Sequence, residues 1–218
     1  ELEKELVQKH KNFIWFSSPG VFVGNSINLI TLIFFTHYYG EQFSGLLAAA
    51  IQYLGLLIMM FSSSFAQVYY NEIAQIKDSN NLLKSYIYWL KRLLIMTLLG
   101  WIILIFTPSS LLTMILGEKW SGLMVTIKII SPWMAVMFVA SSLSYIFIRL
   151  GKQKEVFFFD IFHLVIILFG LLIGHYFLND QIQILYIISS VQTLFYILSI
   201  SLALKFLFEN LKNENAPN

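Results

Sequence analysis

Asp160 and His163, three positions apart inside a long apolar run, are the residues whose types and spacing best fit proton chemistry in this sequence. A helix places residues at this spacing on one face. A carboxylate beside an imidazole can exchange a proton near neutral pH, and such groups form proton relays inside membranes. The pair is therefore a candidate ion-coupling site. Because Asp160 is close to the end of its apolar run, an interfacial ion pair or a hydrogen-bonded cap also fits.

A second pattern places Lys128 and Arg149 near the two ends of one predicted helix. Residues between them recur at three- and four-residue steps, which a helix puts on one face. They are Ser131, Ala135, Phe138, Ser142 and Tyr145. One interpretation is the wall of a hydrated, cationic pathway in which Lys128 and Arg149 bind substrate. The other is that the two cations extend to opposite interfaces while the serine hydroxyls donate to their own backbone.

Amide side chains in three other apolar runs complete the set of candidate substrate-binding residues. They are Asn25, Asn28, Gln52, Gln67 and Gln192. Such groups can bind sugar hydroxyls in a cavity. They can equally join helices through hydrogen bonds worth roughly 1–2 kcal/mol or less each. The sequence leaves both interpretations open.

Six apolar runs carry these residues. They cover residues 13–38, 44–70, 93–106 (preceded by the mixed stretch 82–90), 123–147, 156–178 and 182–207. Most have the roughly 20 residues that a helix needs to cross about 30 Å of hydrocarbon. The sequence therefore predicts an all-α, polytopic membrane bundle of six transmembrane helices. Residues 13–207 form this lobe, 1–12 a cytoplasmic connecting segment and 208–218 a cytoplasmic tail.

Composition and charge agree with a multi-pass membrane protein. Of the 218 residues, 58% are hydrophobic and 12% are charged, whereas soluble domains have about 25% charged residues. Twelve of the 14 Lys and Arg fall at the two ends of the chain and in the second and fourth connections, the exceptions being Lys119 and Lys128. Retained positive charge marks the cytoplasmic side, so both ends are predicted to be cytoplasmic. The basic residues form no patch of the kind that binds nucleic acid.

Signatures of enzymes and cofactors are absent from the sequence. Without cysteine, disulfides and thiolate metal sites are excluded. The four histidines form no H-E-x-x-H pair, and neither a P-loop nor a dinucleotide-binding motif occurs. We therefore expect no catalysis, no cofactor and no metal centre.

Several short motifs occur in a characteristic order along the chain. They are Ser18–Gly20, Ile115–Gly122, Ile129–Trp133, Ser141–Tyr145 and Gly151–Lys154. This order resembles the C-terminal half of the O-antigen and polysaccharide repeat-unit flippases of the multidrug/oligosaccharidyl-lipid/polysaccharide exporter superfamily. Gly117 and Trp120 match an outer-loop Gly-x-x-Trp pattern of that family, and residues 151–153 match its short cytoplasmic Gly-Lys-Gln turn. The resemblance covers about residues 13–205.

The resemblance implies one lobe of a two-lobe transporter, whose partners are the lipid bilayer and a missing N-terminal six-span half. The chain begins without an initiator Met, and we expect such an upstream part. The family is expected to move polyprenyl-diphosphate-linked oligosaccharides across the bacterial inner membrane by alternating access, driven by an ion gradient. Lys128, Arg149 and Arg92 would then meet the diphosphate, and the amides would meet the sugars.

Two other functional classes stay open. A membrane-embedded polymerase or transferase of the same pathway needs an acid/base constellation, but the longest outer connection, residues 107–122, holds only Glu118 and Lys119 as charges. A multidrug or small-cation exporter of the same superfamily favours carboxylates within the spans, where the sequence indicates only Asp160.

Overall fold

Long helices connected by short links make up the chain in the computed structural model, which describes residues 13–178 and 180–214. The elements in order are η1 (Phe13–Ser17), α2 (Ser18–Tyr39), α3 (Glu41–Gln75), α4 (Ser79–Phe106), α5 (Ser110–Leu116), η2 (Glu118–Trp120), α6 (Leu123–Ser142), α7 (Tyr145–Arg149), α8 (Gln153–Phe177) and α9 (Gln181–Glu214). The described residues contain no strand, so the all-α prediction is confirmed.

Six helical segments are long and apolar enough to cross a membrane. They are Trp15–Tyr39, Glu41–Gln75, Ser79–Phe106, Glu118–Arg149, Gln153–Phe177 and Gln181–Glu214. Their outer faces carry large apolar side chains such as Phe22, Phe106 and Phe177, which are 75%, 81% and 74% exposed. So much exposed apolar surface is far more than a soluble monomer presents, and it fits contact with lipid. The prediction of a six-span membrane bundle is confirmed.

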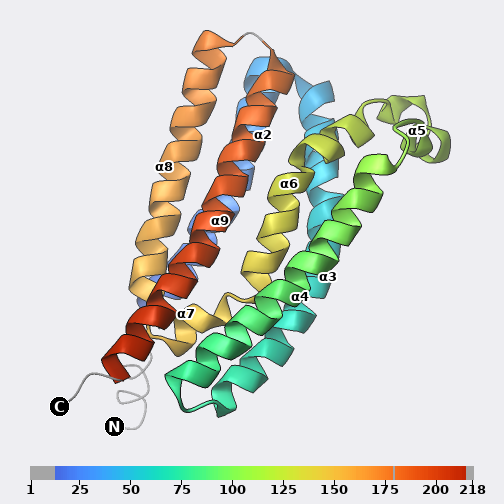
Figure 1. Ribbon diagram of the computed structural model, residues 1–218. Helices are drawn as coiled ribbons and strands as arrows, with labels where there is room; N and C mark the ends of the chain where they lie inside the picture. Colours follow the sequence, from blue (N-terminus) through green and yellow to red (C-terminus); the bar gives the residue numbers. More distant parts are fainter. Residues whose placement is uncertain (1–12, 179, 215–218) are drawn as a thin grey trace.

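The helix α6 is the centre of the bundle. It packs against α3, α4 and α9, while α2 packs against α3 and α8, and α8 packs against α9. Figure 1 shows α8 and α9 to one side of α6, and α3 and α4 to the other. In the most apolar part of the α6 segment 56% of residues are buried, against 28% or less in the other five segments. Its side chains are therefore shielded from lipid.

Several helices extend beyond the predicted apolar runs. The helix α3 continues to Gln75 and α4 begins at Ser79, so residues 71–81, which lie between the predicted apolar runs, are helical except for residues 76–78. Asp78 starts α4 because its side chain accepts a hydrogen bond from the backbone N–H of Asn81, at 2.9 Å. The helix α9 runs to Glu214, so the first part of the predicted tail 208–218 is helical. The predicted connecting segment 1–12 and residues 215–218 lie outside the described residues.

The predicted continuous helix over residues 123–147 is broken at one place, and a second feature alters its hydrogen bonding without breaking it. The first is a turn at residues 143–144 between α6 and α7, where the N–H groups of Leu143 and Ser144 donate to carbonyls three residues back. The second is Pro132 inside α6, which has no N–H to donate to the carbonyl of Lys128. The hydroxyl of Ser131 donates to that carbonyl instead, at 2.8 Å. The fourth span is therefore two helical pieces, the first of them containing a proline.

Candidate functional site

The contact between α8 and α9 positions the main polar site. Gly170 and Gly174 of α8 let α9 approach closely, since a Cβ at either position would lie 3.4 Å from Ile188 or Ile184. This is the close helix contact that small residues four apart favour in membranes. About two turns before Gly170 in α8, the His163 ring stacks on Phe195 of α9, with ring centroids 4.2 Å apart.

Five polar side chains from three helices gather around this contact, and we call them the buried polar cluster. They are Trp133 of α6, Asp160 and His163 of α8, and Gln192 and Tyr196 of α9. The ring of His163 lies 6.1 Å from that of Tyr196, and its side chain is approached by that of Gln192. Tyr196 lies near both Asp160 and Trp133. On its other side Asp160 faces α2, where a Cβ at Gly20 would lie 3.5 Å from the carboxylate.

Three atoms of the buried polar cluster make no hydrogen bond of good geometry within the described residues. They are Trp133 Nε1, His163 Nε2 and Gln192 Oε1, on side chains that are 1%, 6% and 1% exposed. The side chain of Gln192 approaches His163 and that of Tyr196 approaches Trp133, so these groups satisfy one another in part. An unpaired buried polar group typically costs about 1–3 kcal/mol, so this place is a candidate site for a proton, a water molecule or a small ion. The structure thus brings the predicted residues Asp160, His163 and Gln192 into one cluster.

The two structural roles considered for Asp160, an interfacial ion pair and a helix cap, are not seen within the described residues. Among residues 13–178 and 180–214, the salt bridges are Lys152–Glu155 and Lys205–Glu209, and neither includes Asp160 or His163. Asp160 also lies well inside α8, which begins at Gln153, and so it does not cap the helix. In this same part of the chain, no three His, Asp or Glu side chains converge as metal ligands.

Lys128 lies apart from the cluster, in a groove of about 390 Å³ between α6 and α9. We call this the Lys128 groove, and its other lining residues are Ile129, Pro132, Tyr186, Ser189, Ser190, Thr193, Leu194 and Ile197. The hydroxyls of Ser189, Ser190 and Thr193 donate to backbone carbonyls at 2.7–2.8 Å. Their remaining lone pairs can still accept hydrogen bonds. The groove therefore combines one cation with several hydroxyl acceptors.

Arg149 does not share a surface with Lys128. Its guanidinium donates to the carbonyls of Ile73 and Ile76, at 3.3 and 2.8 Å, where it caps the end of α3. Ser131, Ala135 and Phe138 line a different cavity, between α3, α4 and α6. The predicted single polar face through residues 128–149 is therefore divided among three places.

The other predicted amides lie on α2 and α3, which do not contribute side chains to the buried polar cluster. Asn25, Gln52 and Gln67 are exposed and Asn28 is half-buried. On spans that otherwise present apolar surface, these side chains are available to a ligand or to a further protein surface.

Sequence reasoning missed Glu72. It lies just outside the predicted apolar run 44–70, yet α3 includes it, and its carboxylate accepts hydrogen bonds from Ser85 Oγ at 2.6 Å and Trp89 Nε1 at 2.7 Å. The signal was present, because Tyr69, Glu72 and Ile73 continue the three- and four-residue spacing of the buried face of α3. Trp133 was missed for a different reason, since an aromatic residue in an apolar run is usually part of the core.

Comparison with known proteins adds no further constraint. No protein-family model matches the chain, and neither a curated protein nor a solved structure matches it.

Proposed function

We propose that the chain is one lobe of a flippase of the bacterial inner membrane. It moves polyprenyl-diphosphate-linked oligosaccharides across the bilayer by alternating access and uses an ion gradient. The observation that carries the proposal is the buried polar cluster inside a six-span helical lobe. Ionisable groups within membrane spans are costly and generally serve transport or relay.

Ion coupling is assigned to Asp160 and His163. Both side chains can change protonation, and they lie between α2, α8 and α9, so a change of charge acts on three helices at once. Trp133, Gln192 and Tyr196 supply donors and acceptors that can rearrange when a proton or small ion enters. A gradient-driven change in this packing is the type of step that alternating access needs.

Substrate recognition is assigned to the Lys128 groove. A diphosphate needs a cation, and sugars need hydrogen-bonding partners. The groove offers Lys128 beside hydroxyls of α9. Within the described residues Lys128 makes no salt bridge, so its charge is available.

A second six-span half is the proposed partner. Asn25, Gln52 and Gln67 are exposed on membrane-spanning helices, where polar groups normally face protein or a water-filled cavity rather than lipid. An even number of spans gives a preceding copy the same orientation, which is the arrangement of a parallel-repeat transporter.

The first test is export by the full-length protein in cells that depend on it for surface polysaccharide. Lys128→Ala should reduce surface polysaccharide without reducing the amount of protein in the membrane. Lys154→Ala, which removes an exposed cation of α8, is the matched control and should export normally. Unchanged export by Lys128→Ala would refute its role in recognition.

A second test isolates the coupling. In proteoliposomes that contain the lipid-linked substrate, an imposed pH gradient should accelerate flipping by the wild type. Asp160→Asn should flip without this acceleration, because an amide cannot exchange the proton. Glu209→Gln removes a carboxylate in the last part of α9 and should respond as the wild type does. A full response by Asp160→Asn would exclude proton coupling through this residue.

A cation exporter is the second candidate, and Glu72 is the observation that favours it. Glu72 lies inside α3 and is half-buried, so within the described helices it joins Asp160 as a second carboxylate that is not exposed. Efflux of a lipophilic cation that depends on Asp160 or Glu72, with surface polysaccharide unaffected, would favour this alternative over the flippase. A polymerase or transferase would need an acid/base constellation, and the connection at residues 107–122 holds only Glu118 and Lys119 as charged residues.

A further inference from the structure

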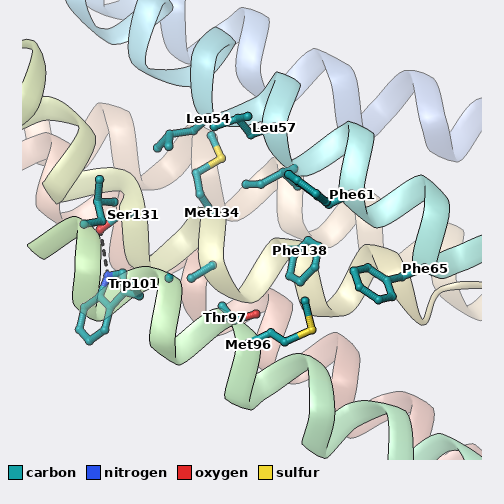
Figure 2. A pocket seen from close by; sticks show the side chains of 14 residues that line it. Leu54, Leu57, Phe61, Phe65, Met96, Thr97, Trp101, Ser131, Met134 and Phe138 are labelled. Carbon is teal, nitrogen blue, oxygen red and sulfur yellow. Dashed lines mark hydrogen bonds between the residues drawn. The ribbon is translucent and has the colours of Figure 1, made fainter. Parts of the chain in front are cut away.

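A groove of about 450 Å³ opens between α3 and α4, with α6 as its floor, and the transport proposal does not use it. Both α3 and α4 pack extensively against α6 and make few contacts with one another, which leaves the space between them. Figure 2 shows Leu54, Leu57, Phe61 and Phe65 on the α3 side of this space. The α4 side carries Met96, Thr97, Gly100, Trp101 and Leu104, and the floor is Ser131, Met134, Ala135 and Phe138 of α6. We call this space the α3–α4 groove.

The α3–α4 groove offers no free polar donor to a ligand. Thr97 Oγ1 donates to the carbonyl of Leu93 at 2.7 Å. Ser131 Oγ donates to the carbonyl of Lys128 and accepts from Trp101 Nε1 at 2.9 Å, the contact drawn as a dashed line in Figure 2. The remaining lining residues are apolar. A sugar or an ion would lose its hydration there without replacement, whereas a hydrocarbon chain would fill the space by dispersion contacts.

The position of the α3–α4 groove makes lipid the available occupant. Its walls are the middle of α3 and the second half of α4, and both helices are long and apolar enough to span a membrane. Leu57, Phe61 and Met96 at its rim are 55%, 59% and 48% exposed. A lipid chain can therefore enter from the side without crossing a polar barrier.

A cation lies at one end of the α3–α4 groove. Phe65 contacts Trp89 of α4, with ring centroids 6.2 Å apart, and this marks the end nearer the start of α4. Arg92 follows Trp89 by three residues and precedes Met96 by four, so it lies within about one helical turn of both. Its guanidinium lies over the ring of Tyr88, 4.2 Å from the centroid. It is exposed and makes no salt bridge within the described residues.

We propose that the α3–α4 groove binds one acyl chain of an anionic phospholipid whose phosphate pairs with Arg92. The apolar lining selects the hydrocarbon chain. The uncompensated guanidinium, next to Lys91, selects an anionic headgroup over a zwitterionic one. Arg92 lies on the side of the bundle where most described cations are found, so the lipid belongs to the leaflet on that side. This site does not depend on the transport function.

Gly100 allows the α3–α4 groove to be filled without disturbing the fold. A Cβ at Gly100 would meet nothing within 4 Å. Because Gly100 lines the groove and its first side-chain atom has room, we expect a phenylalanine at this position to project into the groove. Gly45 of α3 is equally open and exposed but lies outside the groove, so Gly45→Phe is the matched control.

The experiment is native mass spectrometry of the full chain after reconstitution with phosphatidylglycerol or phosphatidylcholine. The wild type should retain one phosphatidylglycerol molecule. Gly100→Phe should lower this retention about tenfold, equivalent to ~1.4 kcal/mol, and Gly45→Phe should not. Arg92→Gln should remove the preference for phosphatidylglycerol over phosphatidylcholine, whereas Lys154→Gln should preserve it.

A second measurement needs no groove-filling variant. Trp101 lines the groove, and its fluorescence is the emission that the wild type has and Trp101→Phe lacks. Phosphatidylglycerol with mid-chain bromine atoms should quench this Trp101 fluorescence. Unchanged retention by Gly100→Phe, or absent quenching of Trp101, would overturn the proposal. So would retention of a polyprenyl phosphate in place of phospholipid, or the loss of a protein dimer rather than a lipid in Gly100→Phe.

Discussion

At the scale of single residues, Glu72 shows how a carboxylate can be placed next to the membrane-spanning part of a bundle. Its two oxygens are used by Ser85 Oγ and Trp89 Nε1, both on α4. Two charge-assisted hydrogen bonds from one neighbouring helix fix α3 against α4 near the short link at residues 76–78. The role that follows from these contacts is to hold the α3–α4 hairpin together.

Glu72→Ala should lower the free energy of unfolding by about 1–3 kcal/mol, because both donors lose their acceptor in a half-buried site. Unfolding by SDS in mixed micelles measures this change. Glu209→Gln removes a negative charge whose contact with Lys205 is long, at 3.8 Å, and exposed, so its effect should be close to zero. Equal effects of the two substitutions would contradict the hairpin role of Glu72.

Asp78 gives a pH-dependent prediction at the start of α4. The backbone N–H of Asn81 donates to its carboxylate, and this holds the pKa of Asp78 below its ordinary value. A lowered pKa means that the carboxylate stabilises the first turn above the ordinary pKa of an aspartic acid. The stabilisation is lost as the pH falls through the lowered pKa. The protection of the Asn81 amide against hydrogen exchange should therefore persist at the ordinary pKa of an aspartic acid and fall only as the pH drops below it.

The control for Asp78 is a background in which Glu214 is glutamine, since the Glu214 carboxylate also accepts from α4, at the N–H of Ser79. In that background Asp78→Asn should abolish the pH dependence of protection at Asn81. A pH dependence that persists in the double variant would assign the effect to another group.

Local spacing decided which site residues could be predicted. Asp160 and His163 are three residues apart in an unbroken helix, so their shared face follows from helix geometry alone. Lys128 and Arg149 are 21 positions apart, and their relation depended on a helix that ends at Ser142. Arg149 also finds its partners, the carbonyls of Ile73 and Ile76, on a helix that is distant in sequence. Residue spacing along the chain cannot predict a hydrogen bond between segments so far apart in the sequence.

At the scale of elements, α6 shows how a proline is accommodated in the centre of a bundle. The carbonyl of Lys128, which Pro132 leaves free, accepts from Ser131 Oγ, and the carbonyl of Ile129 accepts from Ser189 Oγ of α9 at 2.7 Å. Ser131 Oγ also accepts from Trp101 of α4. Side-chain hydroxyls thus satisfy the backbone around the proline and connect α6 to α4 and α9.

The bond between Trp101 and Ser131 should appear in a double-mutant cycle. Trp101→Phe and Ser131→Ala together should be less destabilising than their sum, with a coupling energy of about 0.6 kcal/mol and at most ~1.7 kcal/mol, the range for such bonds in membrane proteins. Unfolding in mixed micelles measures the four free energies. Thr126→Ala is the control partner, because its hydroxyl donates within α6 to Gly122, and it should be additive with Trp101→Phe. Additivity in the Ser131 cycle would show that the bond adds no stability.

Helix existence was predictable, and helix ends were less so. Hydropathy identifies apolar stretches long enough to cross the hydrocarbon core of a bilayer, and on that basis all six spans were predicted. It has no signal where a helix continues into the polar region, as α3 does to Gln75 and α9 does to Glu214. Hydropathy also passes over the turn at residues 143–144, because the residues around it are as apolar as those of the helix.

At the scale of the whole molecule, the antiparallel order of the six spans places most basic residues at one end. Lys77, Arg149, Lys152 and Lys212 all belong to the end where α3 meets α4, α6 leads through α7 to α8, and α9 finishes. Lys119 belongs to the opposite end. The asymmetry is a property of the fold, and under the positive-inside rule it predicts which end faces the cytoplasm.

Cysteine labelling tests this orientation directly, because the sequence has no cysteine of its own. Asn80 and Ser121 are exposed at opposite ends of the bundle, whereas neighbouring Ser79 is 6% exposed and bonded to Asn210. In intact cells, a membrane-impermeant maleimide should label Ser121→Cys and should label Asn80→Cys only after the membrane is opened. Because the spans alternate in direction, the two positions must give opposite results in any orientation. Labelling of Asn80→Cys alone in intact cells would invert the orientation, and the leaflet assigned to the lipid at Arg92 would invert with it. Labelling of both positions in intact cells would contradict the six-span arrangement itself.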